Sequence, residues 1–154
     1  MTRSASLIAP IVVGAMRVTL GVLWLLEGLF KYQAHFDGGD ILLVGGTPRV
    51  PDWFDVFPGS AMQAVPGLFG AGIPLLETGL GVALVLGVLT LPAAIGSLFT
   101  LLLYWSSDQL IDQYPVMAVL SVVILLAPAA ARRFSLSALL LARRSPSPAV
   151  ARWL

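Results

Sequence analysis

Three charged residues lie in the first long apolar segment of the chain, residues 8–35: Arg17, Glu27 and Lys31. A charged side chain at membrane depth costs several kcal/mol unless it is paired or hydrated, so such residues usually face protein or water. At about 100° per helical residue, these three side chains and Trp24 fall within a sector of roughly 80°. A buried group of this kind can relay protons or hold the polar group of a ligand. The sector is therefore predicted to face the inside of the protein.

Glu77 occupies a similar place in the second apolar segment, residues 64–88. It lies near the middle of that segment, on a face that otherwise carries small or helix-bending residues: Gly67, Gly70, Pro74 and Gly81. Because adjacent antiparallel helices bring Arg17 and Glu77 to comparable depth, the sequence predicts a buried ion pair between them. Two roles stay open for this pair. It is either a functional site, or a structural clasp that fixes the register of two helices.

Simpler roles are also open for individual residues. Glu27 and Lys31 are four positions apart and can pair along one helix, and Lys31 can also reach the outer interface. Trp24 either stacks on a ligand ring or on a guanidinium, or packs as an ordinary core residue. His35 is either a proton acceptor beside the end of the first segment or a surface histidine. A single histidine is a poor basis for a metal site.

The composition is that of an integral membrane protein. Of 154 residues, 58% are hydrophobic and 11% are charged, and the mean hydropathy is +0.92. Because cysteine is absent, this chain alone cannot form disulfides, cysteine-ligated zinc sites or iron–sulfur clusters. No nucleotide-binding or nucleophile motif is present, so neither a nucleotide nor a metal cofactor is expected. The basic tail directly follows an apolar segment, which favours lipid headgroups over nucleic acid as its partner.

The predicted fold class is an all-α integral membrane protein, a four-transmembrane-helix bundle over residues 1–131. Its spans are predicted at about residues 8–35, 64–88, 90–107 and 115–131, with an outer segment at 37–63. Residues 52–57 alternate acidic and aromatic side chains, which fits either a short interfacial helix or a loop. Glycines that allow a close approach of a neighbouring helix recur every seven positions and form a ridge along the edge of the charged sector of the first span: Gly14, Gly21 and Gly28.

The distribution of charge predicts the topology. Both termini are basic and carry no acidic residue: Arg3, Arg132, Arg133, Arg143, Arg144 and Arg152. The two connecting segments are acidic: Asp37, Asp40, Asp52, Asp55, Asp108 and Asp112. Under the positive-inside rule, both termini are therefore cytoplasmic. Residues 132–154 form a basic cytoplasmic tail, predicted to be partly amphipathic and then disordered.

Two stretches of the chain resemble a known family. Arg17 with the following LGVLWLLEGLFKYQAHF, and the later PLLETGLG around Glu77, look like the DoxX family of small four-span bacterial membrane proteins. The matching positions are Arg17, Gly21, Gly28, Lys31, Glu77 and Gly81. Glu27 lies at a position where the family is expected to vary, so no role for it follows from the resemblance.

The resemblance implies a membrane subunit of a quinone-linked redox assembly in the bacterial cytoplasmic membrane. The DoxD branch of this family is the small subunit of thiosulfate:quinone oxidoreductase, so an enzymatic role as such a subunit is implied. Arg17 and Glu77 are then the candidate catalytic residues. The candidate site for a quinone or another polar ligand comprises Arg17, Trp24, Glu27, Lys31 and Glu77. The expected partners are membrane lipids, other membrane or redox subunits, and further copies of the chain. The alternatives are a non-catalytic accessory or scaffold subunit and a small proton-coupled transporter.

Overall fold

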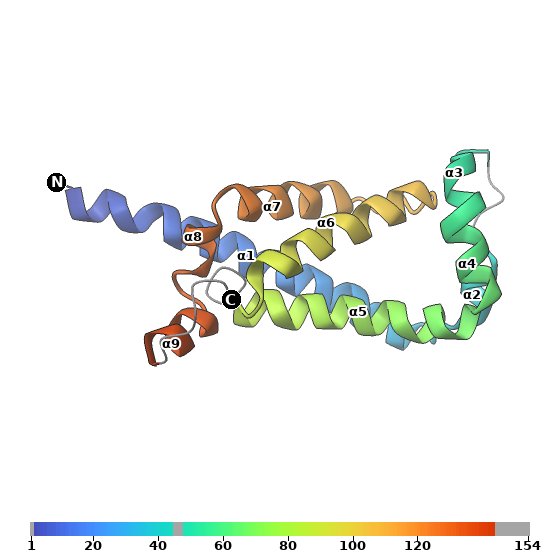
Figure 1. The fold of residues 1–154 in the computed structure, drawn as a ribbon, viewed down its shortest axis with the longest axis horizontal. Coiled ribbons are helices and arrows are strands. Elements are labelled where there is room, and N and C mark those ends of the chain that lie inside the picture. The colour runs from blue at the N-terminus through green and yellow to red at the C-terminus, as the bar shows by residue number, and fades with distance from the viewer. Residues whose placement is uncertain (1, 45–47, 144–154) are drawn as a thin grey trace.

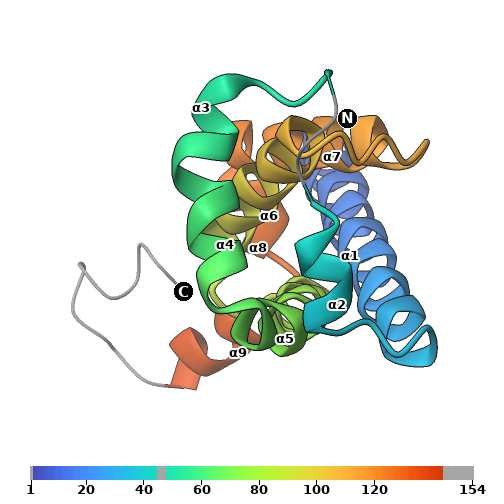
Figure 2. The ribbon, with the colours of Figure 1, turned by 90° about the vertical axis from the view of Figure 1, so that its right-hand side faces the viewer.

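A computed structural model describes residues 2–44 and 48–143, and within these ranges the regular structure is entirely helical. The helices are α1 (Thr2–Gln33), α2 (Gly38–Leu42), α3 (Asp52–Phe54), the π-helix η1 (Asp55–Gly59), α4 (Ser60–Ala64), α5 (Pro66–Leu86), α6 (Thr90–Ser106), α7 (Tyr114–Leu126), α8 (Pro128–Arg132) and α9 (Leu136–Arg143). The four longest helices run along the long axis of the molecule, and α2, α3 and α4 lie across one end (Figure 1). Figure 2 shows the bundle from that end. The predicted all-helical fold is confirmed.

In the part of the chain that the structure describes, two helices are long and apolar enough to cross a membrane. They are α1, over Leu7–Gln33, and α5. The apolar helices α6 and α7 are shorter, with 17 and 13 residues. The segment predicted as a fourth span, residues 115–131, is divided, because the chain leaves helical geometry at Ala127 and α8 begins at Pro128. Proline lacks the N–H that a continuous helix needs and disfavours the α conformation in the preceding residue.

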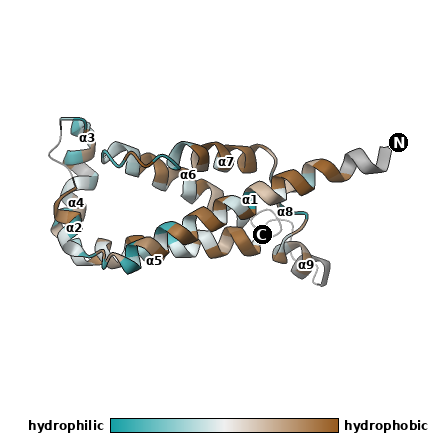
Figure 3. Ribbon diagram, turned by 180° about the vertical axis from the view of Figure 1, so that it is seen from behind, coloured by the Kyte–Doolittle hydropathy of each residue, from teal (hydrophilic) through white to brown (hydrophobic). Residues whose placement is uncertain are grey.

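The helices are apolar on the outside and partly polar on the inside. Along α1, a buried residue recurs every three or four positions, and this inward stripe includes Arg17 and Lys31. Apart from Thr19, the residues between them that face outward are apolar, for example Leu26 and Phe30, which are 53% and 66% exposed. Figure 3 shows hydrophobic residues along the four long helices and hydrophilic residues gathered at α3 and in the connection between α6 and α7. The predicted inward face of α1 is confirmed.

Glycines bring α1 and α5 into backbone contact. A Cβ atom added at Gly81 would lie 2.8 Å from the carbonyl oxygen of Gly21 and 2.8 Å from the amide nitrogen of Leu25. One added at Gly28 would lie 3.1 Å from the amide nitrogen of Thr78. Gly14, the third glycine of the predicted ridge, has no such neighbour within 4 Å. Two of the three ridge glycines therefore fix the register of α1 against α5.

The outer segment folds into short helices around a small core. Asp37 caps α2 by accepting a hydrogen bond from the Gly39 amide at 2.6 Å, and Asp40 accepts one from the Asp37 amide at 2.9 Å. Ile41 and Phe54 are buried. Residues 52–57 thus belong to helices rather than to a loop. At the opposite end, α9 follows the basic residues 132–133, and the predicted disorder beyond residue 145 lies outside the described residues.

Candidate functional site

A buried ion cluster joins α1 to α5. Lys31 Nζ lies 2.6 Å from Glu77 Oε1 and 3.5 Å from Glu27 Oε2. These side chains are at most 9% exposed, and that of Glu77 is fully buried. The close approach at Gly28 allows this contact, because it brings the last turns of α1 against the middle of α5. The structure therefore brings together three of the residues predicted to form the site.

Side chains from the other two long helices complete the cluster. The Tyr104 hydroxyl, on α6, donates to Glu77 Oε1 at 2.7 Å. The Tyr114 hydroxyl, on α7, donates to Glu27 Oε2 at 3.2 Å. The side-chain amide nitrogen Nε2 of the preceding Gln113 donates to Glu27 Oε1. The two tyrosine rings lie 5.5 Å apart, and Lys31 Nζ lies 5.3 Å from the centre of the Tyr104 ring. All four long helices thus contribute to one polar site.

The cluster contains two carboxylates and one ammonium group. Burying an unbalanced charge is costly, so a proton held on either carboxylate would stabilise the site by making it neutral. Glu77 Oε2 is buried and has no hydrogen-bond partner in the described part of the chain. It is therefore the oxygen that is open to a proton or to a ligand donor. A site of this chemistry can bind, hold and release a proton.

Arg17 lies elsewhere, so the predicted Arg17–Glu77 pair is wrong. Arg17 is 2% exposed, and its guanidinium donates to four backbone carbonyl oxygens. Nε donates to Ala131 at 3.0 Å, Nη2 to Phe134 at 3.1 Å, and Nη1 to both Leu84 and Val85, the latter at 3.1 Å. A cation at the carboxyl end of α5 also suits the helix dipole. Arg17 therefore joins α1 to the ends of α5 and α8.

The register of α1 and α5 explains why the predicted pair does not form. Gly21 lies against Gly81 and Gly28 lies against Thr78, so Glu77 faces the last turns of α1. Arg17 lies fourteen residues before Lys31, which is about 21 Å along a helix. The prediction used the approximate depth of each residue in its segment. The relative depth of Arg17 and Glu77 is wrong by several helical turns. The reason is that α1 begins well before the segment that packs on α5, so the middle of α1 does not lie beside the middle of α5 (Figure 1).

Trp24 is a core residue next to the cluster. It is fully buried, and its indole N–H donates to Ser97 Oγ at 2.7 Å. Ser97 in turn shares a hydrogen bond of 2.8 Å with Ser121. The ring of Trp24 lies 6.3 Å from that of Tyr104. Trp24 therefore packs near the Tyr104 ring and, through Ser97 and Ser121, links α1 to α6 and α7.

His35 lies on the surface, just beyond the end of α1. Its backbone adopts a left-handed conformation, with φ of 56°, where the chain leaves the helix. The side chain is exposed and does not belong to the buried cluster. Among the described residues, no three His, Cys, Asp or Glu side chains are grouped so that they could hold a metal ion.

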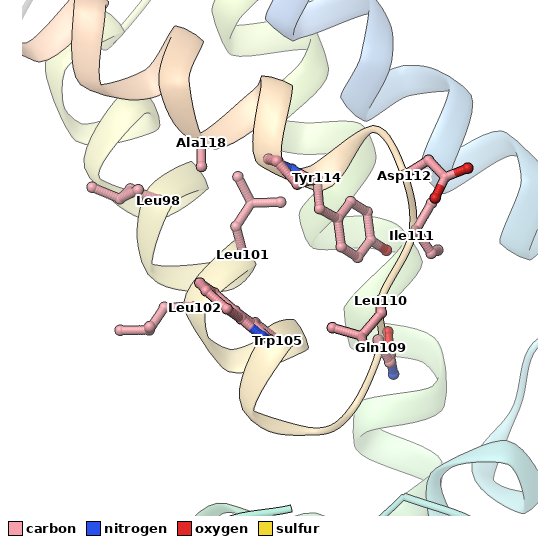
Figure 4. A pocket seen from close by; sticks show the side chains of 11 residues that line it. Leu98, Leu101, Leu102, Trp105, Gln109, Leu110, Ile111, Asp112, Tyr114 and Ala118 are labelled. Carbon is pink, nitrogen blue, oxygen red and sulfur yellow. The ribbon is translucent and has the colours of Figure 1, made fainter. Parts of the chain in front are cut away.

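A cavity of about 620 Å³ lies beside the cluster, between α6, α7 and the loop that connects them (Figure 4). Its walls are largely apolar and include the rings of Trp105 and Tyr114, while Gln109 and Asp112 line it from the loop. Tyr114 is also a member of the buried cluster, through its hydrogen bond to Glu27. Tyr114 thus belongs both to the cavity wall and to the charged site.

The roles of Tyr104, Gln113 and Tyr114 in the site were not anticipated. Tyr104 lies near the outer end of the predicted span at residues 90–107. Tyr114 precedes Pro115 at the start of an apolar segment. The available signal was that a tyrosine at the outer end of each of two neighbouring segments lies at the depth of Lys31. A buried tyrosine hydroxyl usually finds a polar partner, which points to the nearest buried carboxylates.

Comparisons of this chain with protein-family models, with curated proteins and with solved structures found no match. The buried cluster and the cavity beside it are therefore the features of this chain that indicate a function. Their residues supply two carboxylates, an ammonium group and two tyrosine hydroxyls in one enclosed site.

Proposed function

We propose that this chain is a multi-pass protein of a bacterial cytoplasmic membrane and serves as the membrane subunit of a quinone-linked redox assembly, similar to the DoxX proteins. The spans are α1, α5, α6, and α7 continued by α8. The observation that carries the proposal is the buried cluster of Glu27, Lys31 and Glu77, which lies inside a bundle with an apolar exterior. In this function the cluster binds and delivers the protons that accompany quinone chemistry.

The surface supports a membrane location for all four helices. Large apolar side chains face outward on α6 and α7 as well, for example Phe99 at 60% and Val119 at 63% exposed. One end of the bundle carries Arg132 and Arg133, and the other carries the aspartates of the outer segment. This separation agrees with the positive-inside rule, with α8 and α9 on the cytoplasmic side.

The chemistry of the cluster supports a role with protons. Reduction of a quinone to a quinol takes up two electrons and two protons. In this proposal a partner redox protein supplies the electrons, and Glu27 and Glu77 take up the two protons from water one at a time and pass them on at membrane depth. Acid–base groups need a hydrogen-bonded route to their substrate. Tyr114 is hydrogen-bonded to Glu27 and lines the cavity, so it can form part of that route.

Labelling of single cysteines tests the topology, because the native chain contains none. A cysteine at exposed Ser60 in α4 is expected to react with a membrane-impermeant maleimide in intact cells. A cysteine at Ser147 in the basic tail is expected to react only after the cells are opened. Labelling at both positions in intact cells, or the reverse pattern, would contradict the four-span topology.

The functional test is isolation of the chain from its native membranes in mild detergent, followed by measurement of quinone reduction. We expect a redox protein and bound quinone to co-purify with it. Glu77→Gln should lower quinone reduction by about 100-fold while the assembly stays intact, since a positioned acid–base group contributes that much. An assembly that keeps full activity with Glu77→Gln would identify an accessory subunit instead. Proton flux into vesicles that contain this chain alone would identify a transporter.

A further inference from the structure

We propose that the cavity between α6, α7 and residues 107–113 is the binding site for the quinone ring, and that the isoprenoid tail leaves it towards the lipid. This inference rests on the proposed function and names the site at which its ligand binds. A volume of about 620 Å³ is within the usual range of small-molecule sites.

The cavity opens on the side of the bundle that faces lipid. Leu102, Trp105 and Leu110 line it and are 55%, 68% and 60% exposed. In Figure 4, Leu98 and Leu102 lie on the outer side of α6, away from the loop. A ligand dissolved in the membrane can therefore reach the cavity sideways, without crossing the outer segment.

The lining selects a neutral, flat ligand. Trp105 offers an aromatic face at the mouth, and the polar lining groups lie in the loop, where Gln109 can donate to a carbonyl oxygen. The charged lining residue is Asp112, and within the described ranges 2–44 and 48–143 no lysine or arginine lines the cavity. An anionic lipid phosphate would therefore meet a carboxylate and no cation. A quinone ring carries carbonyl acceptors and no charge, which fits this lining.

The cavity wall is connected to the charged cluster at its inner side. Tyr114 lines the cavity, and both Tyr114 and Gln113 donate to Glu27. At its other end the loop is held by Asp108, whose Oδ2 lies 3.0 Å from Arg49 Nη2 in the outer segment. A ligand that moves Tyr114 or Gln113 changes the hydrogen bonds of Glu27. Binding of a ligand in the cavity thus affects the hydrogen bonding of Glu27 in the buried cluster.

Quenching of tryptophan fluorescence by decylubiquinone tests the site, using the full chain in phosphatidylcholine nanodiscs. Ala118 lines the cavity, so Ala118→Phe fills it and should weaken binding by about tenfold or more. Ala71→Phe, at an exposed position on α5 outside the lining, is the matched control and should bind like the native chain. Trp105→Phe should remove much of the quenching, whereas Trp53→Phe should not.

The outcomes separate this inference from the proposed function. If the native chain binds decylubiquinone and neither Ala118→Phe nor Trp105→Phe alters the signal, the quinone binds elsewhere and only this inference fails. If the native chain does not bind it, the proposed function fails as well. If decylubiquinone quenches Trp105 and Ala118→Phe leaves that quenching unchanged, the quinone lies in the lipid beside the cavity and the inference is overturned. If Ala118→Phe does not fold, the two tryptophan variants decide the question.

Discussion

Arg17→Leu is expected to lower the free energy of unfolding by about 3 kcal/mol or more. The substitution removes the hydrogen-bond donor of the four carbonyl groups that the guanidinium now contacts. An unsatisfied buried acceptor costs about 1–3 kcal/mol. Arg17→Lys should restore only part of the loss, because an ammonium group cannot reproduce the planar fork of donors. Denaturant unfolding in detergent, followed by circular dichroism, measures the effect.

Arg49→Leu is the matched control for this experiment. The Arg49 side chain is 73% exposed and its ion pair with Asp108 lies at the surface. Exposed ion pairs contribute about 0–1 kcal/mol, so the control should be close to the native chain in stability. A loss of the same size in both variants would show that Arg17 has no special role in joining α1 to α5 and α8.

The combination of Arg17→Leu with Glu77→Leu tests the correction to the predicted pair. Because Arg17 and Glu77 contact different groups, their effects on the free energy of unfolding should add to within about 0.5 kcal/mol. If the double variant is more stable than that sum by more than about 1 kcal/mol, the two side chains interact after all.

The inward face of α1 was predictable because helical spacing alone determines it. Arg17, Trp24, Glu27 and Lys31 share one sector of an ideal helix, and all four are buried. A charged side chain that faces lipid would be costly, so the polar residues of an apolar helix identify its protein-facing side. No knowledge of the partner helix is needed for that step.

The pairing of charges was not predictable in the same way. It depends on the register between α1 and α5, which is fixed by contacts such as that of Gly21 with Gly81. An error of a few turns in depth exchanges one partner for another. Arg17 also illustrates a second difficulty, since its acceptors are backbone carbonyls. Every residue has a carbonyl, so a sequence gives no sign of which ones are free at a helix end.

The cavity depends on tertiary structure even more strongly. Its lining comes from α6, α7 and the loop between them, and the loop places Asp108 in a left-handed conformation with φ of 62°. Aspartate adopts this conformation more readily than most residues, but its presence in a loop does not predict it. The sequence indicated that residues 107–113 form a connection, and the structure shows that they border a cavity.

Lys31→Met is expected to have the largest effect of any single change in the cluster. It removes the one cation from between Glu27 and Glu77 and leaves two buried carboxylates. Breaking a buried ion pair costs about 3–5 kcal/mol, so the variant should fold poorly or recover little stable protein from the membrane. Glu27→Gln is the matched comparison. It leaves Lys31 and Glu77 as a balanced pair at 2.6 Å, and its stability should be close to that of the native chain.

A double variant then separates a structural role of the cluster from a role in proton delivery. Lys31→Met with Glu77→Gln removes one charge of each sign and leaves Glu27, on which a proton keeps the site neutral, so its stability should return most of the way to the native value. If the cluster delivers protons, quinone reduction by the assembly stays low in this stable double variant and is also reduced in stable Glu27→Gln. If the cluster only holds α1 against α5, the double variant regains activity together with stability, Glu27→Gln keeps its activity, and the proton role is disproved. Proton delivery requires the carboxylates themselves, whereas a structural clasp requires only that the buried charges balance.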